Sequence, residues 1–131
     1  MRRTERAQAT LEFALVIPVF FLLMLGIFDV SRAYVAYTVV ASCAREAARS
    51  GALATPQSGW DAQAKQAGLN LAVGVDRSAL SIAVAQTTID PSSRPYVRAD
   101  VTYAFRSVTP LVGRLLGDPI QLTASALVLA G

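Results

Sequence analysis

An apolar run near the N-terminus constrains how this chain can fold more than any other feature. Residues 13–28 carry no charge. As an α-helix they would extend about 24 Å, which is short for a hydrocarbon core of about 30 Å, and adding residues 7–11 makes the helix long enough. We therefore expect a membrane-spanning helix over residues 8–28, preceded by a short basic leader of residues 1–7.

One acidic side chain lies inside this apolar helix. Glu12 is about one and a half turns inside the expected cytoplasmic boundary of the span. A charged side chain at the bilayer centre costs about 2.5–3.5 kcal/mol on insertion scales, so this carboxylate needs a route to the headgroups, a proton or a cationic partner. Glu12 is thus the first candidate for a functional residue. In the same run, Pro18 removes one helical hydrogen bond and Gly26 offers a surface for close approach.

The helical pattern continues past the span. No breaker occurs until residues 54–59, which include Pro56 and Gly59, so we expect one helix of nearly fifty residues, with residues 29–55 outside the membrane. Along this part, small and apolar residues recur at steps of three and four, which predicts a narrow packing seam for another helix or for the sheet of the chain's own domain. The members of the seam are Ala33, Tyr37, Val40, Ala44, Ala47 and Gly51.

Residues 56–131 predict one small domain. Residues 60–73 have the pattern of a short helix, whose apolar side is formed by Trp60, Ala64, Ala67 and Leu71. Residues 79–89, 97–106 and 119–130 alternate as strands do, and the turn residues 90–95 predict that the first two form an antiparallel hairpin. Residues 109–117 predict a short apolar helical turn that covers the sheet. The expected fold class is α+β: a long N-terminal membrane-spanning α-helix extends into a small domain with a short helix and a roughly three-stranded antiparallel sheet.

The composition excludes several classes of function. The chain has no histidine and one cysteine, Cys43, so the usual general base, the commonest metal ligand and a thiolate zinc site are missing. No glycine motif for binding phosphates occurs either. We expect no enzyme activity, no metal and no cofactor, and we interpret Cys43 as a small packed residue. The net charge of +3 is explained by Arg2, Arg3 and Arg6 beside the span, so we expect no nucleic-acid partner.

Charged residues also follow the span. Asp29 with Arg32, and the group of Arg45, Glu46 and Arg49, are spaced for contacts along one helix. We expect solvated intrahelical pairs that each contribute a few tenths of a kcal/mol.

Several segments together resemble one known family. They are the basic leader with residues 8–13, the apolar helix, residues 26–33 and residues 44–49. In this order they look like the N-terminal signature of the TadE-like family, which are minor pseudopilins of the tight-adherence (Tad) branch of the type IV pilus machinery. A weaker similarity extends to residues 101–105, to residues 109–111 and to the closing strand.

The resemblance implies a structural function in assembling or priming a Tad-type pilus for adhesion. It implies cleavage by a prepilin peptidase between Ala7 and Gln8, which makes Glu12 the fifth residue of the mature chain. Ala7 departs from the glycine that is common at this position in related prepilins. Glu12 and Phe13 would contact other pilins or pseudopilins, and the pilus assembly machinery and membrane lipid would be further partners.

The resemblance also implies a location, the bacterial cytoplasmic membrane, with the N-terminus in the cytoplasm and the C-terminal domain outside, and incorporation into a surface pilus. Physical chemistry agrees independently. A newly exposed α-amino group on Gln8 has a reference pKa near 7.7–8.0, so it would be a cation at about the depth of Glu12 in a neighbouring subunit.

Two other interpretations stay open at this stage. In one, the chain is an uncleaved single-span binding module that recruits a partner outside the cytoplasmic membrane. In the other, residues 13–28 belong to an ordinary secretory signal and a soluble domain is released. Glu12 at the start of the apolar run, and Asp29 with Arg32 where a neutral cleavage site belongs, argue against the secretory signal.

Overall fold

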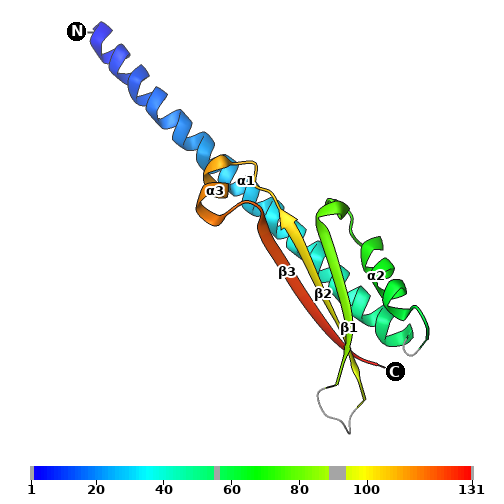
Figure 1. The fold of residues 1–131 in the computed structure, drawn as a ribbon. Coiled ribbons are helices and arrows are strands. Elements are labelled where there is room, and N and C mark those ends of the chain that lie inside the picture. Colours follow the sequence, from blue (N-terminus) through cyan, green and yellow to red (C-terminus); the bar gives the residue numbers. More distant parts are fainter. Residues whose placement is uncertain (1, 55–56, 89–93, 131) are drawn as a thin grey trace.

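The structure is a computed structural model that describes residues 2–54, 57–88 and 94–130. Figure 1 shows half of a long helix projecting alone from a small domain, in which the other half of that helix packs along a sheet. This confirms the expected α+β class. The elements in chain order are α1 (Arg2–Ala54), α2 (Trp60–Asn70), the 3₁₀ turn η1 (Arg77–Ala79), β1 (Leu80–Thr87), β2 (Tyr96–Phe105), α3 (Pro110–Leu116) and β3 (Ile120–Leu129).

Helix α1 is continuous over 53 residues and runs through Pro18 without a break. From Glu5 to Phe28 its side chains are exposed or half-exposed, as expected of a helix whose surroundings are lipid or other chains. Among the described residues, α1 is the one helix that is long and apolar enough to cross a membrane.

The three strands form an antiparallel sheet in the order β1-β2-β3. Val101 in the central strand pairs with Ile82 on one side and with Ala124 on the other. These three side chains and their neighbours two residues away face α1, and the central strand is the most deeply buried of the three. The outer face of the sheet carries no helix (Figure 1) and consists largely of small and polar residues.

The packing seam predicted on α1 is confirmed from Val40 to Gly51, is half-buried at Ala33 and is wrong at Tyr37. Val40, Ala44 and Ala47 are at most 1% exposed and pack on the sheet, whereas Tyr37 is 47% exposed. Ala36 lies on the buried face in its place, because the twisted sheet follows a slightly rotated line along the helix. The seam therefore contacts the chain's own domain. The fully buried Cys43 packs in the same core, as the sequence predicted.

Helix α2 crosses α1 at a glycine. A Cβ atom on Gly68 would lie 3.0 Å from the carbonyl oxygen of Cys43 and 3.0 Å from Cδ1 of Ile82. The helix ends at Asn70, three residues earlier than predicted, and Leu71 is 44% exposed instead of packed. The predicted stop at residues 54–59 agrees with the end of α1 at Ala54, although residues 55–56 lie outside the described part. The predicted hairpin turn falls largely on residues 90–93, which are also outside it.

The helical turn predicted at residues 109–117 is present as α3, and Gly117 ends it with a φ of +83°. Its predicted position on the sheet is wrong. Leu115 and Leu116 are 76% and 70% exposed, and α3 lies beyond the ends of β2 and β3, beside α1 (Figure 1). The reason is that α1 and α2 already cover the inner face of the sheet, while hydrogen bonds to Asp29 hold the start of α3 against α1.

Candidate functional site

The residues predicted for processing and assembly lie on the free half of α1. Ala7, Gln8, Glu12 and Phe13 are all exposed, Phe13 at 65%. Gln8 Nε2 donates a hydrogen bond of 3.1 Å to Glu12 Oε1, one helical turn away. No cation of the described residues lies within 4.0 Å of the Glu12 carboxylate. Within the described residues, this acid thus has a neutral donor and no cationic partner.

A second acidic residue of α1 has the opposite surroundings. The Asp29 side chain is 2% exposed. Its Oδ1 accepts a hydrogen bond of 3.0 Å from the backbone N–H of Val108, and its Oδ2 accepts one of 2.7 Å from the backbone N–H of Thr109. These contacts join residues about 80 positions apart, at the point where α1 leaves the domain. We call this arrangement the Asp29 joint.

Arg32 completes the joint from the next turn of α1. Its Nη1 lies 3.6 Å from Asp29 Oδ1, and its guanidinium carbon lies 5.4 Å from the centroid of the Phe105 ring at the end of β2. A guanidinium at this distance from an aromatic face is attracted by the ring quadrupole. The expectation of a solvated Asp29–Arg32 pair is therefore wrong for the acid, which is buried by the segment before α3, and holds only for the half-exposed arginine.

The Asp29 carboxyl stays ionised near neutral pH. Burial alone would raise its pKa, but the Thr109 side chain, the two backbone N–H groups and the Arg32 guanidinium together lower the pKa below its ordinary value of 3.8. The buried Thr109 hydroxyl has no hydrogen-bond partner of normal geometry among the described residues. The two N–H groups are the bonds that hold the joint.

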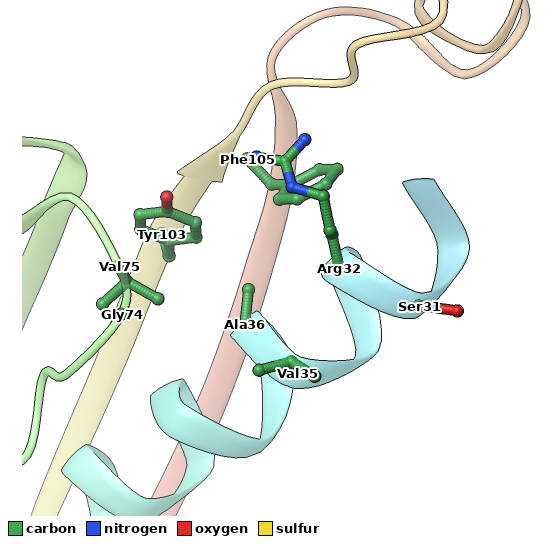
Figure 2. Close-up of a pocket in the computed structure, with 8 residues that line it drawn as sticks. All are labelled: Ser31, Arg32, Val35, Ala36, Gly74, Val75, Tyr103 and Phe105. Atoms are coloured by element: carbon green, nitrogen blue, oxygen red, sulfur yellow. The ribbon is translucent and has the colours of Figure 1, made fainter. Parts of the chain in front are cut away.

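A shallow groove lies next to the joint. It has a volume of about 250 Å³ and opens between α1, the loop before η1 and β2. Figure 2 shows Arg32 across the Phe105 ring at one end, Tyr103 and Val75 along one side, and Ser31 pointing away. A smaller hollow of about 150 Å³ lies on the other side of Arg32 and Phe105, where Asp76 and Arg106 contribute to the wall.

Further ion pairs are formed within the chain, away from the Asp29 joint. On the outer face of the sheet, Arg98 Nε lies 2.9 Å from Asp100 Oδ2, and Ser125 Oγ donates a hydrogen bond of 2.5 Å to Asp100 Oδ1. The Ser125 hydrogen bond lowers the pKa of Asp100. Arg49 and Glu46 form the expected exposed pair along α1, with 3.8 Å between Nη1 and Oε2. The described residues contain no group of three or more acidic, histidine or cysteine side chains that could hold a metal ion.

Sequence reasoning missed the joint, although a signal for it was present. Asp29 follows directly on an apolar run, where a charge is exposed to the edge of the bilayer unless the chain binds it. The segments 26–33 and 109–111 had both contributed to the family resemblance, and the joint connects them. Nothing in the spacing of the two segments shows that they touch, because 80 residues separate them.

Comparisons with known proteins agree with the N-terminal half of the resemblance. A family model described as TadE-like protein matches residues 7–49, a segment within α1 that begins at Ala7 and includes Glu12 and Asp29. Searches of curated proteins and of solved structures found no match. The similarity of the strands to this family lies outside the matched segment and stays a prediction. Over residues 7–49 this chain is similar to the TadE-like proteins, which confirms the resemblance seen in its sequence and suggests a pilin-like protein associated with Tad pili.

Proposed function

We propose that this chain is a minor pseudopilin that takes part in assembling or priming a Tad-type pilus. Helix α1 spans the cytoplasmic membrane with its N-terminus in the cytoplasm, and the α+β domain lies outside. A prepilin peptidase cuts between Ala7 and Gln8. The mature chain then joins other pilins or pseudopilins through Glu12 and Phe13.

The observation that carries this proposal is the uncompensated charge of Glu12. Its one hydrogen bond within the described residues comes from the neutral Gln8 amide, so these residues supply no cation to an acid that would lie in lipid, and a cation from another chain would stabilise its charge. The α-amino group that cleavage creates on Gln8 is such a cation. The two groups are four residues apart, so pairing between neighbours shifts one α1 along the other by about 6 Å.

The experiment begins with the N-terminus of the protein purified from membranes. Sequencing by mass spectrometry is expected to find Gln8 as the first residue. A retained Met1 would instead favour the uncleaved anchor, and a mature form without residues 8–28 would favour a secretory signal.

A pair of variants then tests the role of the acid. Glu12→Gln removes the charge in the span, and Glu46→Gln removes one from the exposed Glu46–Arg49 pair on the same helix. Removing one partner of a buried ion pair costs about 3–5 kcal/mol. We expect Glu12→Gln to insert into the membrane at wild-type level but to be lost from the pilus or its initiating complex, while Glu46→Gln assembles normally. Equal assembly of both variants would contradict the pairing.

A further inference from the structure

Three apolar side chains in and next to α3 are not packed against the rest of the domain. Val108 is 60% exposed, Leu115 is 76% exposed and Leu116 is 70% exposed. They lie before the first turn and in the last turn of a seven-residue helix. A helix this short gains little stability of its own, so its position depends on its contacts. The Asp29 joint supplies them by binding the backbone of Val108 and Thr109.

The Asp29 joint fixes the position of these side chains along the axis of α1, close to Asp29. Asp29 is the first residue after the predicted span, and Ile27 and Phe28 just before it are 66% and 58% exposed. In Figure 1, α3 lies beside α1 where the free half of the helix leaves the domain, closer to that half than any strand. Exposed apolar side chains are therefore present both at the end of the predicted span and on α3.

Basic side chains accompany this apolar surface. Arg106 precedes Val108 by two residues and Arg114 lies within α3, and both are exposed. Arg32 in the joint is 43% exposed. Arginines at such a boundary extend their apolar stems along the lipid and reach the phosphates with their charged ends. Apolar side chains with basic neighbours are typical of segments that lie in the surface of a bilayer.

We propose that residues 108–116 form a lipid-binding foot, which lies on the membrane surface that faces the domain. Leu115 and Leu116 enter the boundary between headgroups and acyl chains, and the neighbouring arginines contact anionic phosphates. The foot sets how close the domain lies to the bilayer. This inference rests on the insertion of α1 described under the proposed function.

The test measures the depth of single fluorescent labels in the full chain reconstituted into vesicles of phosphatidylcholine and phosphatidylglycerol. An NBD group is attached to Leu116→Cys, and quenching by nitroxides on the headgroup side or at the end of the acyl chain is compared. The native Cys43 is fully buried and does not compete for the label. Phe21→Cys tests insertion of the span. Leu53→Cys is a matched control, because Leu53 is 72% exposed and lies about 36 Å further along α1 than Asp29.

We expect the label at residue 116 to be quenched several-fold more than the label at residue 53, and more by the shallow nitroxide than by the deep one. The label at residue 21 should show the reverse order of depth. If the label at residue 21 is quenched and the label at residue 116 behaves like the one at residue 53, α1 inserts into the membrane but the proposed lipid-binding foot is contradicted. If residue 116 has a blue-shifted emission without lipid quenching, a protein covers α3 and the proposal is also wrong. Absence of quenching at residue 21 would overturn both proposals.

Discussion

Replacing Asp29 by asparagine should release the foot and leave the rest of the domain folded. The substitution keeps the shape of the side chain but presents one oxygen and one NH₂ group to two N–H donors, those of Val108 and Thr109. One charge-assisted hydrogen bond is lost and the other becomes a neutral one. Hydrogen bonds to charged groups contribute about 1.5–3 kcal/mol and neutral ones about 1 kcal/mol. The ion pair with the half-exposed Arg32 adds only a few tenths.

The hydrogen bonds therefore dominate, and Asp29→Asn should lower the free energy of opening this segment by about 2–5 kcal/mol. Since about 1.4 kcal/mol corresponds to a factor of ten, the Val108 and Thr109 amides should exchange with solvent roughly 30- to 4,000-fold faster. Hydrogen exchange of the full chain in detergent micelles, read by NMR, measures these two amides directly. Fluorescence of Trp60, which packs on the core cluster of Ala52 and Val97 at the other end of the domain, should stay unchanged.

The pH dependence of this effect has a definite sign. The folded pKa of Asp29 lies below 3.8, so its carboxylate stabilises the folded state above that pH and loses this contribution as the pH falls through the folded value. The difference between wild type and Asp29→Asn should be constant near neutral pH and shrink below pH 3.8. Asp61→Asn, which removes an exposed charge 3.8 Å from Lys65, is the control and should change neither amide. Unchanged exchange in Asp29→Asn, or an equal change in both variants, would refute the role of the joint.

Two further predictions concern the core. Gly68→Ala should destabilise the domain by about 1–3 kcal/mol, as measured by urea unfolding followed by Trp60 fluorescence. The new methyl group would lie 3.0 Å from a backbone carbonyl oxygen. This clash outweighs the gain in helix propensity, which is about 1 kcal/mol for alanine over glycine. Gly26→Ala, whose Cβ would meet nothing within 4 Å, should not be destabilised, and equal stability of the two variants would show that α2 can move away from α1. The thiol of Cys43 should resist maleimide at neutral pH until urea unfolds the domain, because burial raises its pKa and closes access to it. Labelling of the folded protein at the rate of a free thiol would contradict this packing.

The periodic parts of the fold could be predicted from the sequence. The helix through residues 8–54 and the three alternating strands follow from local patterns, since each residue's side of its element is fixed by a period of 3.6 or 2. The contacts of the Asp29 joint could not be predicted in this way, because the position of Asp29 after the apolar run does not show which backbone N–H groups, about 80 residues away, its carboxylate binds. The prediction of where α3 lies was wrong for the same reason. Its leucines suggested burial on the sheet, but only the three-dimensional contacts show that the inner face is already occupied.

For the predicted site residues, too, contacts within one helix could be predicted and contacts with another chain could not. Gln8 and Glu12 form one helical turn, so their hydrogen bond follows from their spacing. The partner proposed for Glu12 would lie on another chain, so its position would depend on the packing between subunits. Residue patterns within one chain can therefore suggest a cationic partner for an acid in an apolar helix, but they do not place it.

The unbroken course of α1 links the two acidic residues mechanically. Glu12 and Asp29 are 17 residues apart on one rod, and at about 100° per residue their side chains point in directions about 100° apart around its axis. No loop separates the end that would meet other subunits from the end that carries the sheet. Under the proposed function, a rotation of α1 where a neighbour binds Glu12 would therefore turn the whole domain, and it would set the direction in which the uncovered face of the sheet points.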